Sequence, residues 1–167
     1  HVAHRRSRDS SHDERIAGAA WTLFKIMSQR KINVAIVGLG FGAAFIPLWQ
    51  KHPPADCYAI CQRNEDKLNA VGDYFGVNAR YQDYAALLKD KNVDVVHINS
   101  PIPDHAWMSI AALKAGKHVL CEKPLCLTAD HAAKLCAERD RTGRHIEEGF
   151  AFRNHPQWEK LEELMAS

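Results

Sequence analysis

A glycine-rich segment that directly follows an apolar run limits the folds open to this chain more than any other feature. Residues 32–37 read Ile-Asn-Val-Ala-Ile-Val, and Gly38-Leu-Gly-Phe-Gly42 follows at once. Apolar runs of this length are typical of strands buried on both faces of a parallel sheet. Glycine tolerates the backbone angles of a sharp turn out of such a strand. The sequence therefore predicts a strand, a tight turn and a helix from residue 32 onward.

Strand-like and helix-like segments alternate along the rest of the chain. Strands are expected at residues 32–37, 57–61, 80–81, 93–98, 117–121 and 145–149. Helices are expected at residues 43–51, 64–75, 83–89, 104–115 and 128–141, and a further helix starts at residues 155–156. A strand followed by a helix, repeated along the chain, implies right-handed crossovers between parallel strands. The predicted fold class is α/β, with a doubly wound parallel sheet.

Length and charge exclude several classes of protein. With 167 residues, of which 46% are hydrophobic and 25% charged, the chain is large enough for one hydrophobic core and is not disordered as a whole. The formal net charge of +2 lies entirely in residues 1–26, which hold five basic and three acidic side chains. Binding of nucleic acid or of an anionic membrane requires a basic surface, so neither partner is expected.

The cysteine pattern indicates a reducing compartment and no metal site. The five cysteines are Cys57, Cys61, Cys121, Cys126 and Cys136. Their number is odd and most of them lie in apolar segments, which is typical of reduced, buried thiols. We therefore expect a cytoplasmic protein. Neither the first two nor the next two cysteines have the two-residue gap of a zinc knuckle, so no structural zinc is expected.

The glycine-rich turn matches a pattern that binds dinucleotides. Gly38, Gly40 and Ala43 fit G-x-G-x-x-G/A, and the match lies between a predicted strand and a predicted helix, as the pattern requires. In such a turn Gly38 permits the tight bend and Gly40 lets the backbone approach a diphosphate, which the N–H groups of the following helix hold. The alternative is a glycine-rich turn without a ligand. We expect the dinucleotide-binding turn.

Two polar residues follow the second predicted strand, where dinucleotide-binding folds commonly carry an acid for the ribose hydroxyls of NAD. Here those residues are Gln62 and Arg63, and the carboxylate is missing. Gln62 can hydrogen-bond a ribose, and Arg63 can pair with the 2′-phosphate of NADP or stack on adenine. Arg63 can equally be a solvated surface charge. The sequence leaves the choice between NAD and NADP open.

Another polar segment follows the fourth predicted strand, at the sheet edge where open α/β folds bind ligands. It contains Ser100, Pro101 and His105, and Asp104 is the expected cap of the next helix. In the first helical turn the positive end of the helix favours a neutral His105 imidazole. The alternative is that His105 is a turn residue bonded to the backbone.

Two charged residues follow the fifth predicted strand. Glu122 and Lys123 precede Pro124, which fixes the turn. Near a bound nicotinamide, Lys123 can hydrogen-bond a substrate hydroxyl and stabilise the negative charge that develops as hydride leaves, and Glu122 can orient this ammonium group. The alternative is an exposed salt bridge between the two side chains, which contributes little. Spacing alone does not decide between these interpretations.

Four motifs occur together in this chain. They are Gly38-Leu-Gly-Phe-Gly42, Ser100-Pro101 with His105, residues 111–124 ending in Cys-Glu-Lys-Pro, and Phe152-Arg-Asn-His-Pro156. Together they resemble the Gfo/Idh/MocA oxidoreductase family, which includes glucose-fructose oxidoreductase and inositol 2-dehydrogenase. The likeness covers about residues 31–167, and Glu122-Lys123-Pro124 is its most specific part.

The resemblance implies a Rossmann domain that binds NAD or NADP, followed by a second α/β domain that carries the substrate pocket and mediates homo-oligomer formation. Lys123 is then the catalytic lysine, and Glu122 lies near the nicotinamide ribose. The cofactor-binding residues are then Gly38, Gly40, Phe41, Gly42, Gln62, Arg63, Ser100, Pro101, His105, Glu122 and Lys123. The implied reaction transfers a hydride between nicotinamide and a small molecule, namely a sugar, a polyol such as inositol or a related hydroxy compound.

The chain departs from the family pattern in two residues and in length. Gln62 replaces the frequent Asp, and Ile102 stands where many members have Asn. Family members are also much longer. We therefore expect residues 1–26 to be a non-native or disordered extension, residues 27–150 to form the cofactor-binding domain, and residues 151–167 to begin the connection into a substrate domain missing from this chain.

The family's catalytic Asp and His belong to that missing domain, so the fragment alone is expected to be inactive. One alternative function is a non-catalytic dinucleotide-binding module or sensor. Another is a transferase that binds a nucleoside or a methyl donor, but such a protein gives no reason for Glu122-Lys123-Pro124.

Overall fold

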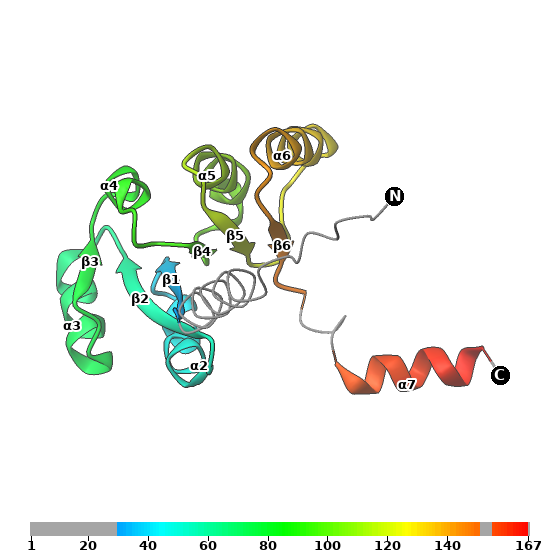
Figure 1. The fold of residues 1–167 in the computed structure, drawn as a ribbon, viewed down its shortest axis with the longest axis horizontal. Coiled ribbons are helices and arrows are strands. Elements are labelled where there is room, and N and C mark those ends of the chain that lie inside the picture. Colours follow the sequence, from blue (N-terminus) through cyan, green and yellow to red (C-terminus); the bar gives the residue numbers. More distant parts are fainter. Residues whose placement is uncertain (1–29, 151–154, 167) are drawn as a thin grey trace, which may run out of the picture. The chain divides into compact units, whose positions relative to one another are not determined.

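Six parallel strands form one sheet in the order β3-β2-β1-β4-β5-β6 (Figure 1). The computed structural model describes residues 30–150 and 155–166, so the expectation for residues 1–26 lies outside the described residues. The strands are β1 (Ile32–Val37), β2 (Ala55–Cys61), β3 (Ala79–Tyr81), β4 (Val95–Ile98), β5 (His118–Cys121) and β6 (Ile146–Glu148). The chain builds outward from β1 in one direction and then from β4 in the other. This order confirms the predicted doubly wound sheet.

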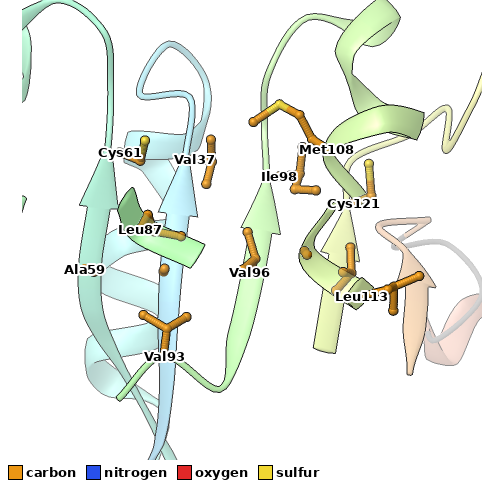
Figure 2. Packing of buried hydrophobic residues seen from close by; sticks show 13 residues of the cluster. Val37, Ala59, Cys61, Leu87, Val93, Val96, Ile98, Met108, Leu113 and Cys121 are labelled. Atoms are coloured by element: carbon orange, nitrogen blue, oxygen red, sulfur yellow. The ribbon is translucent and has the colours of Figure 1, made fainter. Parts of the chain in front are cut away.

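Helices cover both faces of the sheet (Figure 1). On one face lie α4 (Tyr84–Lys89), α5 (Ile102–Lys114) and α6 (Ala129–Thr142). On the other lie the 3₁₀ turn η1 (Gly42–Phe45), α2 (Ile46–Lys51) and α3 (Glu65–Phe75). The first face packs its apolar side chains against α5, as Figure 2 shows for Val96, Ile98 and Met108. The second face packs Ile36 and Ile60 against Ile46 and Leu68.

Helix ends follow the predicted capping residues in most places. The Asn64 side chain accepts a hydrogen bond from the backbone N–H of Lys67 at the start of α3, and Thr128 does the same for His131 at the start of α6. After α6, Gly143 takes the left-handed conformation with φ of 64°. The helix α7 (Pro156–Met165) begins after His155, as predicted.

Prolines account for two differences from the prediction. The expected helix at 43–51 is a 3₁₀ turn followed by α2, because Pro47 has no N–H to donate to the carbonyl of Ala43. The expected cap at Asp104 is wrong: α5 begins at Ile102, and its N-cap is Pro101. Proline is tolerated in the first helical turn, where N–H groups lack helical partners in any case, so α5 starts earlier than predicted.

Gly38 lets the ends of β1 and β4 approach each other closely. Its φ is +88°, and a Cβ placed on it would lie 2.6 Å from the Asn99 carbonyl oxygen and 2.9 Å from the Ser100 nitrogen. Both obstacles are backbone atoms, which cannot rotate away. The Asn99 N–H also donates to the Val37 carbonyl at 2.8 Å, so the two strand ends are tied together. Glycine is therefore required at position 38 for conformation and for space.

Replacing Gly38 with Ala should destabilise the fold strongly. We expect Gly38→Ala to lower the free energy of unfolding by about 3 kcal/mol or more, because backbone strain and a backbone clash add together. The control is Gly76→Ala, where φ is +67° but no atom lies within 4 Å of the added Cβ. In that variant the free energy of unfolding should fall by only about 1 kcal/mol. Urea denaturation measures both, and equal losses would show that contact with Asn99 does not restrict this position.

Candidate functional site

A cavity of about 880 Å³ lies at the carboxyl ends of β4, β5 and β6, beside α2. Five of the residues predicted from sequence line it: Phe41, Ser100, His105, Glu122 and Lys123. They come from the segments that follow β1, β4 and β5, and His105 among them lies in the first turn of α5. The carboxyl ends of parallel strands meet at one sheet edge, and this brings the loops together.

The glycine bend offers an open stretch of backbone next to this cavity. A Cβ added to Gly40 would meet no atom within 4 Å, whereas one added to Gly42 would lie 3.0 Å from side-chain atoms of Asn99 and Ile36. Gly42 thus packs tightly against the sheet, and Gly40 leaves its backbone free for close approach. This arrangement fits a bound diphosphate.

Three predicted residues outside the glycine bend do not line the cavity. Gln62 and Arg63 follow β2, on the opposite side of β1 from the cavity, and Pro101 caps α5. Gln62 is half-buried and its N–H donates to the Tyr81 carbonyl at 3.0 Å, while Arg63 is exposed. The glycine bend therefore has Gln62 and Arg63 on one side and the cavity on the other.

His105 joins two of the loops through backbone carbonyl groups. Its side chain is 1% exposed. Nδ1 lies 2.8 Å from the Pro124 carbonyl oxygen, and Nε2 lies 2.8 Å from the Ser100 carbonyl oxygen. The geometry matches the interpretation of His105 as a residue bonded to the backbone. It holds the loop that carries Lys123 next to the end of β4.

Lys123 is exposed and is not neutralised by its neighbour. It forms no ion pair with any residue in the part of the chain that the structure describes, so the interpretation as a salt bridge with Glu122 is not observed. The peptide bond between Lys123 and Pro124 is cis. Glu122 is half-buried, and its N–H donates to the Ile98 carbonyl at 2.9 Å. The ammonium group at the cavity rim is thus available to a ligand.

The structure adds three residues that sequence reasoning missed, namely Trp49, His97 and Asn99. All three line the cavity. His97 is 1% exposed, its Nδ1 accepts a hydrogen bond from Trp49 Nε1 at 3.2 Å, and its ring centroid lies 4.7 Å from that of Phe45. Burial lowers the pKa of His97 to about 4, so the ring is neutral near pH 7. A histidine inside a buried apolar strand was the available signal, because such strands seldom carry ionisable groups.

The described residues contain neither a metal cluster nor a membrane span. No group of three or more His, Cys, Asp or Glu in residues 30–150 and 155–166 is placed to hold a metal ion. Within the same ranges, no helix has the length and apolar character needed to cross a bilayer.

Comparison with known proteins identifies the family. The model of the Gfo/Idh/MocA oxidoreductase family, with an NAD-binding Rossmann fold, matches residues 32–150. The chain belongs to this family. Myo-inositol 2-dehydrogenase of Thermotoga maritima is 32% identical over 135 residues, which make up 80% of this chain and 40% of that protein. D-Xylose 1-dehydrogenase (NADP⁺) 2 of Haloferax volcanii is 41% identical over 109 residues, or 65% of this chain and 34% of that protein.

A solved structure with a bound dinucleotide has the same fold as this Gfo/Idh/MocA domain. The 3-ketoreductase KijD10 from Actinomadura kijaniata, in complex with NADP, superposes with a TM-score of 0.77 at 31% identity. The match covers 82% of this chain and 44% of KijD10. The chain thus spans less than half the length of these relatives, and its fold is the NAD(P)-binding Rossmann domain of the family.

His97 should make the stability of the domain depend on pH between about 6.5 and 4. Because its pKa falls from 6.5 to about 4 on folding, the unfolded chain binds a proton in a range where the folded chain does not. This contribution to stability is complete above pH 6.5 and is lost as the pH falls toward 4, by roughly 3 kcal/mol. We expect wild type to lose more stability than His97→Gln in urea denaturation at descending pH. Identical losses would contradict this role of His97.

Proposed function

We propose that this Gfo/Idh/MocA chain is the cofactor-binding part of an enzyme that transfers a hydride between NAD or NADP and a CH–OH group of a sugar, polyol or related hydroxy compound. The observation that carries this proposal is one cavity lined by both Phe41 of the glycine bend and Lys123, which forms no ion pair among the described residues. The names of the relatives, which include inositol and xylose dehydrogenases, support the substrate class.

The glycine bend and its neighbours hold the dinucleotide in this proposal. Gly38, Gly40 and Gly42 bring the backbone of the bend against the diphosphate. Gln62 and Arg63 face the adenosine half, where an arginine favours the 2′-phosphate of NADP. The nicotinamide half enters the cavity between Phe41 and the segments that follow β4 and β5, where Ser100, His105 and Glu122 line the cavity and Pro101 caps α5.

Lys123 is the proposed catalytic residue. When bound, the oxidised nicotinamide supplies an acceptor for hydride. The Lys123 ammonium donates a hydrogen bond to the substrate hydroxyl oxygen and stabilises the negative charge that develops on this oxygen as its proton passes to a base, which the family resemblance places in the second domain. Its exposed position at the cavity rim, without an ion pair among the described residues, supports this role, because a neutralised ammonium group would stabilise that charge less.

Compartment and assembly complete the proposal. Cys57, Cys61 and Cys121 are buried free thiols, and burial raises the pKa of each to about 12, which suits a reducing compartment such as the cytoplasm. Homo-oligomer formation stays a prediction from the family resemblance.

The cofactor test is a titration of the full-length protein with NADH and NADPH, followed by nicotinamide fluorescence. We expect binding by wild type and a loss of about tenfold or more for Gly40→Ala, because the added methyl group occupies the approach to the backbone. The free energy of unfolding should change by less than about 0.5 kcal/mol, since nothing lies within 4 Å of that methyl group. Unchanged affinity in Gly40→Ala would overturn the assignment of the bend.

Arg63→Ala reports on cofactor choice in the same assay, where a larger loss of affinity for NADPH than for NADH identifies Arg63 as the partner of the 2′-phosphate.

The catalytic test concerns Lys123. In the full-length enzyme, Lys123→Ala should reduce turnover by about 100-fold or more, the usual size of a general acid–base contribution, and leave cofactor affinity within a few-fold. The matched control is Lys114→Ala, which removes an exposed ammonium group at the end of α5 and should leave turnover unchanged. Steady-state rates with xylose and myo-inositol provide the measurement. Normal turnover in Lys123→Ala removes this residue from the chemistry.

A further inference from the structure

The inner wall of the cavity carries buried polar atoms that the described protein does not satisfy. Nε2 of His97, Oδ1 of Asn99 and Oγ of Ser100 have no hydrogen-bond partner among the described residues. All three residues line the cavity. Leaving a buried polar group unpaired costs free energy, so three such atoms on residues that line one cavity point to a ligand with matching polar groups.

The Trp49 hydrogen bond determines what His97 can offer. An indole N–H only donates, so Nδ1 of His97 must be the acceptor in the 3.2 Å contact. Because the ring is neutral, its single proton then lies on Nε2. The unpartnered Nε2 is therefore a hydrogen-bond donor.

Asn99 offers the opposite chemistry two residues further along the chain. Its Nδ2 donates to the His97 carbonyl oxygen at 3.3 Å, so Oδ1 is the free atom and acts as an acceptor. The Asn99 side chain is held in place because Gly42 packs closely against it: a Cβ added to Gly42 would lie only 3.0 Å from the Asn99 Cβ. His97 on β4 thus offers one donor, and Asn99, just beyond the end of this strand, offers one acceptor; their spacing of two residues places both side chains on the same side of the chain.

A primary carboxamide is the group that matches this pair. It carries one acceptor oxygen and one donor nitrogen on a planar unit, and neither atom can exchange its role. The nicotinamide ring bears such a group. Phe41, which follows the open Gly40, lines the same cavity as His97, so a dinucleotide whose diphosphate lies on the bend extends its nicotinamide into this space.

We propose that His97 and Asn99 bind the carboxamide of the nicotinamide, with His97 Nε2–H donating to its oxygen and Asn99 Oδ1 accepting from its N–H. This inference rests on the proposed function. The two residues are positioning residues: they prevent the ring from turning over, so one face of it is presented toward the substrate. Trp49 acts through His97, because it keeps the imidazole proton on Nε2.

Ligands that differ only at the carboxamide test this assignment by calorimetry on the full-length protein. His97→Phe and Asn99→Ala should each weaken NADH by about three- to tenfold, the size of one neutral hydrogen bond. Both should bind ADP-ribose, which lacks the nicotinamide ring, within twofold of wild type. With 3-acetylpyridine adenine dinucleotide, which keeps the carbonyl oxygen but has no amide N–H, only His97→Phe should lose affinity relative to wild type.

His118→Ala is the matched control, because His118 lies on β5 and does not line the cavity, and it should bind all three ligands normally. Equal loss of NADH and ADP-ribose in the variants, or no loss of NADH, would overturn the carboxamide assignment. If circular dichroism shows that His97→Phe is unfolded, Asn99→Ala alone tests the carboxamide assignment, through its affinities for NADH and for the acetylpyridine dinucleotide. Failure of wild type to bind NADH would instead overturn the proposed function, and the carboxamide assignment with it.

Discussion

The close approach of the β1 and β4 backbones at Gly38 is the contact on which the site depends. The Asn99 carbonyl lies where any other residue at position 38 would place its Cβ, and hydrogen bonds from Asn99 to Val37 and from Gly38 to Cys61 hold three strand ends together. With the strands this close, the glycine bend lies directly beside the polar segment that follows β4. The cavity exists at this edge because the chain diverges from there, toward α2 after β1 and toward α5 after β4.

Strand β4 shows how a buried strand can carry polar chemistry. Val96 and Ile98 belong to the apolar cluster against α5 (Figure 2), whereas His97 faces the cavity beside α2. Successive side chains along a strand point to opposite faces of the sheet, so one strand can contribute to the apolar cluster and to the cavity. Burial disfavours the charged imidazole, and the hydrogen bond from Trp49 offsets part of the cost of burying the neutral one. A neutral ring with a known proton position is better suited to recognise a ligand than a ring that changes charge near pH 7.

The sequence predicted the sheet and the grouping of the loops because both follow from local patterns. Apolar runs identify buried strands, and the carboxyl ends of parallel strands meet at one edge whatever the details of the helices. Prolines at 47, 101 and 103 altered the helix starts, since a missing N–H changes the hydrogen bonding of a single turn without changing the apolar pattern. Trp49 and His97 are 48 positions apart, so no local pattern indicates their hydrogen bond. Gln62 and Arg63, which lie outside the cavity, were predicted only by their place after β2.

The position of β1 between β2 and β4 separates two kinds of recognition in the molecule. On the β2 side, Arg63 is exposed to solvent, where a charged pair with a phosphate gains little from burial and is weakened by salt. On the β4 side, neutral hydrogen-bonding atoms lie buried next to aromatic rings, where an unmatched partner is costly. The β2 side therefore suits the choice between NAD and NADP, because a few surface substitutions there can change which of the two is preferred. The β4 side suits exact placement of one ring, because any group that fails to pair with His97 and Asn99 leaves both of them unsatisfied.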